Sequence, residues 1–146
     1  MSKQQKNLLL QWALFYSQLG YRILPVKEGA KSALFRDWPS QATSDEAMIR
    51  GWWVKWPAAN VAILCDKIVV LDFDDHNSEF LQKLEADLRS RYVKVITPRG
   101  GSHIYLKLHH GKRWKPVNGV VEKVDVRTAN SYVLTPPSRV EPGFYT

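Results

Sequence analysis

The sequence contains little cysteine and no long apolar run, and each absence excludes a class of protein. Cys65 is the single cysteine among 146 residues, so it forms no internal disulfide bond and holds no zinc ion alone. No apolar stretch approaches the roughly 18 residues that a membrane span needs. The basic start, through Asn7, is not followed by the small-residue cleavage site of a signal peptide. We therefore expect a cytoplasmic protein with no membrane segment and a buried, reduced thiol.

Repeats, low-complexity tracts and interdomain linkers are also missing. The length suits one domain with a substantial core, and the contents of 45% hydrophobic and 24% charged residues are ordinary for a globular protein. Residues 1–146 are therefore expected to form a single domain, either alone or as the N-terminal part of a longer protein. The formal net charge of +7 favours polyanionic partners, although charge alone does not identify a nucleic acid.

The spacing of apolar residues predicts an α+β fold, in which helices pack on a mostly antiparallel sheet. Helices are expected over residues 8–19, 46–55 and 78–89. Strands are expected over residues 21–26, 60–64, 68–74, 93–96, 102–108, 124–126 and 132–134. We expect a loop over residues 27–39, a turn over residues 109–112, and no regular structure after Pro136-Pro137-Ser138.

Single residues mark several ends of these elements. Gly20 follows the first expected helix and is typical of a helix C-cap. Pro25 favours an edge strand or a strand end for residues 21–26, because proline donates no backbone hydrogen bond. The segment Thr43-Ser44-Asp45-Glu46 has the spacing of a capping box and predicts the start of the second helix.

Two carboxylates alternate at the end of an apolar strand, in Leu71-Asp72-Phe73-Asp74. Side chains alternate across a strand, so Asp72 and Asp74 point to one side and their apolar neighbours to the other. Two like charges held together repel, and a hard divalent cation removes that cost. The pair therefore indicates a Mg²⁺ or Mn²⁺ site that handles phosphates, with two solvated surface acids as the alternative.

A second informative segment is Arg99-Gly100-Gly101-Ser102-His103 with the strand that follows it. Two glycines permit a close approach of the backbone to a ligand, and free N–H groups in such a turn can bind phosphate. His103, Tyr105 and Lys107 are expected to share one face of the strand. The alternative is a tight hairpin turn beside a histidine that is hydrogen-bonded within the protein.

A third acid, Asp125, lies between two valines in a short expected strand, where it needs a partner or a metal ion; the alternative is that it pairs with Arg127 or caps a turn. Sites that transfer phosphoryl groups with two metal ions use two or three carboxylates to hold ions about 3.5–4 Å apart. Asp72, Asp74 and Asp125 supply that number. Asp75 extends the acidic run but faces the other side of an ideal strand.

In this order the motifs resemble those of the N-terminal domain of bifunctional DNA primase-polymerases (Prim-Pol), in the archaeo-eukaryotic primase superfamily. The three motifs of that family correspond here to Leu71-Asp72-Phe73-Asp74, Gly101-Ser102-His103 and Val124-Asp125. The resemblance extends over roughly residues 8–145. Flanking features that resemble the family include residues 20–26, Lys31 with Trp38, Trp52-Trp53 with Asn60, Pro136-Pro137-Ser138 and Gly143 with Tyr145.

The resemblance implies an RRM-like catalytic sheet packed against a second small α/β unit, and nucleotidyl transfer from NTPs or dNTPs. It implies that two Mg²⁺ or Mn²⁺ ions are held by Asp72, Asp74 and Asp125. Ser102 and His103 would contact the triphosphate of the incoming nucleotide. Further contacts with phosphates or template are expected from Lys107, Arg127 and Arg99, and Tyr132 is expected near the sugar.

The implied partners are a single-stranded or primed DNA template and a C-terminal helical accessory domain, often with a helicase. The chain departs from some relatives because it lacks a zinc-binding cluster and has Asp75-His76-Asn77 where a glycine is common. A non-catalytic nucleic-acid-binding module on the same scaffold is one alternative, and a structural domain with incidental surface acids is another. A nicking nuclease is disfavoured, because His109 and His110 are adjacent and would face opposite sides of a strand.

Overall fold

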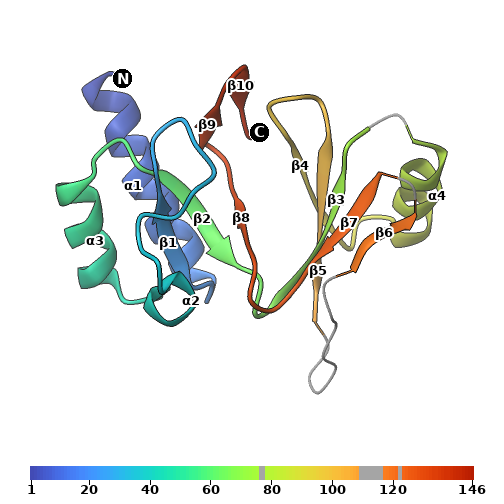
Figure 1. Cartoon of the computed structure of the whole chain (residues 1–146), viewed down its shortest axis with the longest axis horizontal. Coiled ribbons are helices and arrows are strands. Elements are labelled where there is room, and N and C mark those ends of the chain that lie inside the picture. Colours follow the sequence, from blue (N-terminus) through green and yellow to red (C-terminus); the bar gives the residue numbers. More distant parts are fainter. Residues whose placement is uncertain (76–77, 109–116, 122) are drawn as a thin grey trace.

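The computed structural model describes residues 1–75, 78–108, 117–121 and 123–146 as helices packed on antiparallel sheets (Figure 1). The helices are α1 (Lys3–Gln18), α2 (Trp38–Gln41), α3 (Glu46–Lys55) and α4 (Glu79–Leu88). The strands are β1 (Ile23–Val26), β2 (Asn60–Leu64), β3 (Ile68–Phe73), β4 (Val93–Ile96), β5 (Ser102–Lys107), β6 (Val117–Val121), β7 (Val124–Arg127), β8 (Tyr132–Leu134), β9 (Arg139–Val140) and β10 (Gly143–Phe144). The predicted α+β fold is confirmed.

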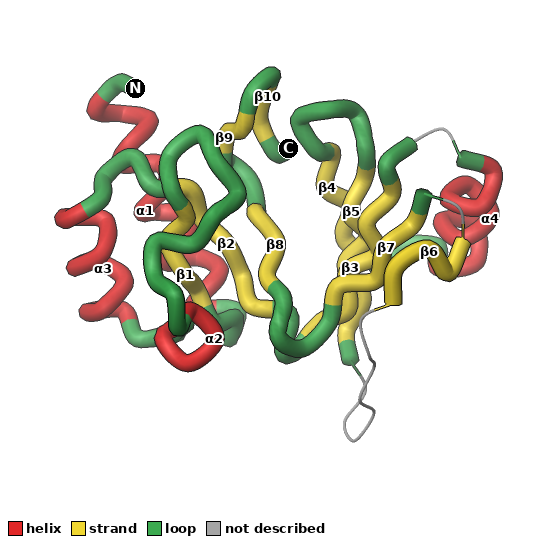
Figure 2. The backbone as a smooth tube through the Cα atoms, in the orientation of Figure 1, coloured by secondary structure: helices red, strands yellow, loops and turns green. Residues whose placement is uncertain are grey.

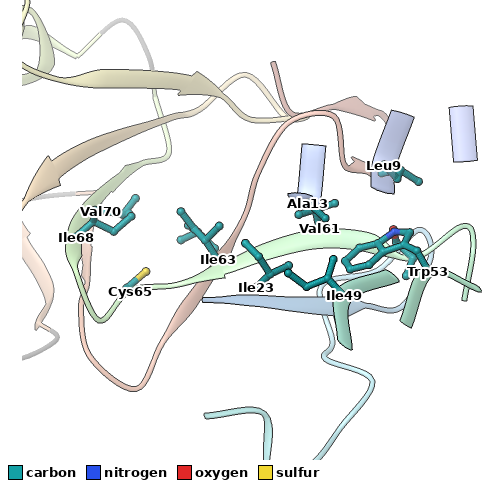
Figure 3. Close-up of a cluster of buried hydrophobic side chains, with 12 residues drawn as sticks. Leu9, Ala13, Ile23, Ile49, Trp53, Val61, Ile63, Cys65, Ile68 and Val70 are labelled. Carbon is teal, nitrogen blue, oxygen red and sulfur yellow. The ribbon is translucent and has the colours of Figure 1, made fainter. Parts of the chain in front are cut away.

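The N-terminal unit is a three-stranded sheet in the order β1-β2-β8, with α1 and α3 packed on one face. Figure 3 shows side chains of both helices, among them Ala13 and Ile49, gathered on apolar residues of the sheet such as Val61. Pro25 lies in β1 at the edge of the sheet, as predicted. Cys65, at the end of β2, is fully buried in this core, and burial raises the pKa of its thiol to about 12.

The caps of the N-terminal helices explain where they begin and end. Gly20, at φ +90°, follows α1, and its N–H donates to the carbonyl of Ser17 while the N–H of Tyr21 donates to that of Tyr16. The helix begins five residues before the expected start, because Ser2 and Gln5 form a capping box on a polar first turn. The cap of α3 is Asp45 rather than Thr43, since the Asp45 side chain accepts the N–H of Met48.

The second sheet has five antiparallel strands in the order β4-β5-β3-β7-β6, so β5, β3 and β7 are interior strands of an RRM-like sheet. Its side chains alternate between two faces. Phe73, Ile104 and Val124 turn to one face, where they pack with Leu81 of α4. The opposite face turns toward the N-terminal unit, and Val70 on this face joins the core of that unit.

Figure 2 shows the two sheets side by side, and buried apolar residues of both units form one cluster. The short turn at Asp66 and Lys67 joins β2 to β3, although these strands belong to different sheets. Tyr105 of β5 packs against both apolar clusters of the N-terminal unit. Thr146 exchanges two backbone hydrogen bonds with Ile96, at the outer edge of β4. Contacts between the units therefore run along β4, β5 and β8 and hold the second sheet in place.

Some regular elements were not predicted. The short helix α2 interrupts the expected loop, and β6 begins in a segment for which no strand was expected. The β9–β10 hairpin follows Pro136-Pro137-Ser138, where regular structure was expected to end, so that prediction is wrong. It is held by the side chain of Asn60, which accepts the N–H of Arg139 at 2.9 Å and donates to its carbonyl at 2.8 Å.

The expected turn at residues 109–112 lies outside the described residues. Within the described ranges, no helix is both long and apolar enough to cross a membrane.

Candidate functional site

One cross-strand row on the five-stranded sheet brings together an imidazole and two carboxylates. Asp72 of β3 lies in register with His103 of β5 on one side and with Asp125 of β7 on the other. Residues in register on antiparallel strands point to the same face, so these three side chains all emerge on the face turned away from α4. Nε2 of His103 lies 3.4 Å from Oδ1 of Asp72. The row places two of the three predicted acids and the predicted histidine side by side.

Arg127 connects the two carboxylates of this row. It lies two residues beyond Asp125 on β7, so both side chains project from the same face. Its Nη2 atom is 3.5 Å from Oδ2 of Asp72 and 3.6 Å from Oδ2 of Asp125. Because a guanidinium group is always charged, Arg127 reduces the repulsion between the two acids.

Asp72 is ionised in this setting although its side chain is only 23% exposed. Burial acts to raise its pKa, but the hydrogen bond and charge of His103, together with Arg127, outweigh burial and lower the pKa of Asp72 below its ordinary value. Burial and the nearby charge of Asp72 raise the pKa of Tyr145 to about 12, so its phenol is neutral. The Tyr145 ring lies 5.8 Å from the His103 ring and closes one side of the row.

The lowered pKa of Asp72 predicts a pH-dependent contribution to stability. A carboxyl group whose pKa is lowered on folding stabilises the folded state above its unfolded pKa of about 3.9, and this stabilisation is lost as the pH falls through the folded value. Replacing Asp72 with Asn removes the contribution. The difference in thermal midpoint between wild type and Asp72→Asn should therefore be larger at pH 7 than at pH 3. Equal differences at both pH values would contradict this account of the row.

The row opens into a cavity of about 260 Å³ that several parts of the chain enclose. Asp74 lines the cavity directly after β3 and is exposed. Other lining residues come from the loop before α2, the turn between β4 and β5, and the turn between β9 and β10; they include Lys31, Arg99 and Glu141. The cavity therefore has acids and Arg127 on the sheet, and two basic groups and the acid Glu141 on other walls, so it can take cations and phosphate together.

The turn between β4 and β5 approaches the end of β3 very closely. A Cβ atom on Gly101 would lie 2.4 Å from the carbonyl oxygen of Phe73 and 3.3 Å from that of Asp74. Gly100 adopts φ +85°, and its N–H donates to the carbonyl of Thr97 at 3.0 Å. That N–H is thus engaged within the turn, and Gly101 serves a close contact between two protein segments that positions Asp74.

The hydroxyl of Tyr132 fixes the loop that carries Lys31. It donates a hydrogen bond to the carbonyl of Lys31 at 2.7 Å and accepts one from the N–H of Ala33 at 3.0 Å. The Tyr132 ring packs edge-on against Trp38, with centroids 4.8 Å apart. Tyr132 therefore holds a basic residue at the cavity, and its expected place near a bound sugar stays a prediction.

Two predicted nucleotide-binding residues lie away from the cavity lining. Ser102 is fully buried, and alternation along β5 places its side chain with Ile104 on the α4 face. Lys107 is exposed and pairs with Ile68, four residues before Asp72 on β3, which is about 13 Å along a strand. The contacts of Ser102 and Lys107 with a nucleotide or template stay predictions. Arg99 and Arg127, in contrast, both line the cavity.

Sequence reasoning assigned no role to Lys31, Glu141 or Tyr145. The only signal for Lys31 was its place among the flanking features of a family resemblance. Glu141 lies in a hairpin that was not predicted, and Tyr145 reaches His103 through the pairing of the last residues with β4. All three depend on contacts between segments far apart in the chain.

No three His, Cys, Asp or Glu side chains among the described residues are already arranged to hold a metal ion. The donor set nevertheless suits a hard divalent cation, because carboxylate oxygens are its preferred ligands and Asp72, Asp74 and Asp125 line one cavity. Asp72 and Asp125 already share one cationic group, the guanidinium of Arg127. The residues present therefore fit Mg²⁺ or Mn²⁺, provided that Arg127 moves.

Comparison with known proteins agrees with the motifs. The family model for the N-terminal domain of bifunctional DNA primase/polymerase matches residues 13–146, which include every residue of the cavity named above. No curated protein sequence gave a significant match.

Proposed function

Because the chain belongs to the bifunctional DNA primase/polymerase family, we propose that this cavity carries out template-dependent nucleotidyl transfer. One observation carries the proposal: the sheet register sets Asp72 between Asp125 and His103, beside Asp74, at the open end of β3. In the proposed reaction, the 3′-hydroxyl of a primer attacks the α-phosphorus of an NTP or dNTP. A phosphodiester bond forms and pyrophosphate leaves.

Asp72, Asp74 and Asp125 are the proposed ligands of two divalent cations, Mg²⁺ or Mn²⁺. When bound, such ions lower the pKa of the attacking hydroxyl and neutralise charge on the leaving pyrophosphate. His103 keeps Asp72 ionised and fixed in orientation through its contact at 3.4 Å. Asp72 and Asp125 lie on strands that are paired in register, so these two ligands are held by rigid elements, and little rearrangement of the sheet is needed.

The basic groups that line the cavity are suited to the triphosphate. Lys31 and Arg99 come from two different turns, and Arg127 comes from β7. His103 also lines the cavity, and an imidazole N–H can donate a hydrogen bond to a phosphate oxygen. We propose that these four residues bind phosphate oxygens. We also propose that the backbone of Ser102, which precedes His103 on β5, contacts the triphosphate.

Template and primer are the proposed macromolecular partners. The net charge of +7 favours the DNA backbone, and binding of this kind weakens steeply with salt. The exposed Lys107, at the far end of β5, is a proposed backbone contact. A helical accessory domain and a helicase, on the same chain or on separate proteins, are proposed to assist priming.

Replacing Tyr132 with Phe is predicted to raise the KM for the nucleotide several-fold, with a smaller effect on kcat. The variant loses the hydroxyl that holds the Lys31 loop at the cavity, and the lost hydrogen bonds lower the free energy of unfolding by about 1 kcal/mol. Tyr16→Phe is the matched control, because its hydroxyl donates to the carbonyl of Pro136 at 2.8 Å, at a place outside the cavity lining. Steady-state kinetics should distinguish the two variants. Equal KM values in Tyr132→Phe and Tyr16→Phe would show that the Lys31 loop has no part in nucleotide binding.

Primer extension tests the proposed function. The protein is incubated with a primed single-stranded template, dNTPs or NTPs, and Mn²⁺ or Mg²⁺, and DNA binding is measured in parallel. We expect extension that stops on addition of EDTA. DNA binding without extension, unchanged in Asp72→Asn, would favour the non-catalytic binding module instead.

A further inference from the structure

The guanidinium of Arg127 contacts both carboxylates of the row to which the proposed function assigns metal ions. Its Nη2 atom lies 3.5 Å from Asp72 and 3.6 Å from Asp125. A divalent cation on the same oxygens would place a second positive charge beside the guanidinium, and the two would repel at that distance. Arg127 and a metal ion therefore compete for Asp72 and Asp125.

The contacts of Arg127 are weak enough to exchange. A strong pair between arginine and a carboxylate is bidentate, with two bonds of about 2.7–2.9 Å. Here a single nitrogen faces both acids at longer distances, and the side chain of Arg127 is 41% exposed. Both ion pairs are thus of the partly solvated kind that contributes little to stability, so their loss on metal binding is a small cost.

The cavity provides space in which the displaced guanidinium can contact a bound triphosphate. Arg127 lines the same space of about 260 Å³ as Lys31 and Arg99. A planar guanidinium matches two phosphate oxygens better than an ammonium group does. A triphosphate that enters this space can therefore accept Arg127 when the carboxylates no longer hold it.

We propose that Arg127 is an exchangeable internal counter-ion of the site. It neutralises Asp72 and Asp125 before metal ions bind, and it moves to the incoming triphosphate when a metal ion takes those carboxylates. This inference rests on the proposed function and adds a coupling to it. A bound metal ion frees Arg127 for the triphosphate, and a triphosphate that holds Arg127 frees the two carboxylates for a metal ion. Each ligand therefore strengthens the binding of the other.

Binding of Mn²⁺ without nucleotide, measured by electron paramagnetic resonance in 0.15 M salt, gives the first test. Arg127→Gln removes the competitor and should bind Mn²⁺ about three- to tenfold more tightly than wild type. Arg99→Gln is the matched control: it removes one positive charge from the same cavity, but Arg99 forms no ion pair with a described residue. Its Mn²⁺ affinity should change less than about twofold, because salt screens exposed charges. If Arg127→Gln does not fold, Arg127→Met takes its place in this measurement, with the same expected result.

Binding of dATP gives the second test, with saturating Mg²⁺ and again in EDTA. The exchange predicts that Arg127→Gln weakens dATP binding about tenfold or more with Mg²⁺, when Arg127 is free to bind phosphate. In EDTA the same substitution should change the affinity less than about twofold, because the acids then hold Arg127. Equal weakening under both conditions would overturn the exchange and make Arg127 an ordinary phosphate ligand.

Asp72→Asn separates this inference from the proposed function. Weaker Mn²⁺ binding in Asp72→Asn, together with tighter binding in Arg127→Gln alone, supports both. If Asp72→Asn weakens Mn²⁺ binding while Arg127→Gln matches Arg99→Gln, the exchange fails and the proposed metal site stands. If Mn²⁺ binding is unchanged in Asp72→Asn, the metal site of the proposed function fails.

Discussion

Replacing Asp72 with Asn is expected to slow nucleotide addition by at least about a thousandfold while the protein stays folded. Asn keeps the shape of the side chain but loses the charge that a metal ion binds. Metal ions stabilise the transition state of such reactions by several kcal/mol, and a thousandfold loss corresponds to about 4 kcal/mol. The rate of a single addition to a primed template measures the effect, and circular dichroism with thermal unfolding confirms the fold.

The matched control for this substitution is Glu85→Gln. Glu85 forms an ion pair with Lys94 at 2.7 Å and its side chain is 23% exposed, the same exposure as that of Asp72, but it does not line the cavity. Its rate of addition should equal that of wild type. A wild-type rate in Asp72→Asn, or an equal loss in both variants, would show that the row is not the reacting centre.

Replacing Gly101 with Ala is expected to damage both stability and activity. The new Cβ would lie 2.4 Å from the Phe73 carbonyl oxygen and 3.0 Å from Oγ1 of Thr97, so either the turn or the end of β3 must shift. Crowding of this kind lowers the free energy of unfolding by about 1–3 kcal/mol. A displacement of about 1 Å at Asp74 would reduce the rate of addition about a hundredfold. Thermal unfolding and single-addition kinetics measure the two effects.

Gly51→Ala separates this steric effect from a general effect of adding a methyl group. Gly51 is exposed in α3, and nothing lies within 4 Å of the position of its added Cβ. Alanine there should stabilise the protein by about 0.5–1 kcal/mol, because glycine is a poor helix former. The rate of addition should not change. Wild-type stability and rate in Gly101→Ala would refute the close contact between the turn and β3.

The parts of the fold that follow from local pattern were predictable from the sequence. A run of apolar residues predicted β3, alternation of polar and apolar residues predicted β5, and Gly20 marked the end of α1. The β9–β10 hairpin was not predictable in this way. Its strands are two residues long, and they are held by the Asn60 side chain and by Ser138, whose hydroxyl bonds to the backbone of Val61. Such contacts have no periodic signal in the sequence.

The candidate site was likewise predictable only where it depends on local sequence. The period of one strand predicted that Asp72 and Asp74 lie close together, and both line the cavity although Asp74 comes just after β3. The place of Asp125 beside Asp72 depends on the register between β3 and β7, which the chemistry of two-metal sites and the resemblance to a family suggested but no pattern within either strand predicts. Lys31 reaches the cavity through a hydrogen bond to Tyr132, and no pattern within either segment predicts that pairing.

The most direct test of the central claim is addition of a single nucleotide by the wild-type protein to four primed templates that differ only in the templating base. Mn²⁺ is supplied, and each dNTP is offered alone. We predict that each nucleotide is added only opposite its complement and that EDTA abolishes addition. A protein that binds the primed DNA but adds no nucleotide to any of the four templates would contradict the assignment of this cavity as a polymerase site.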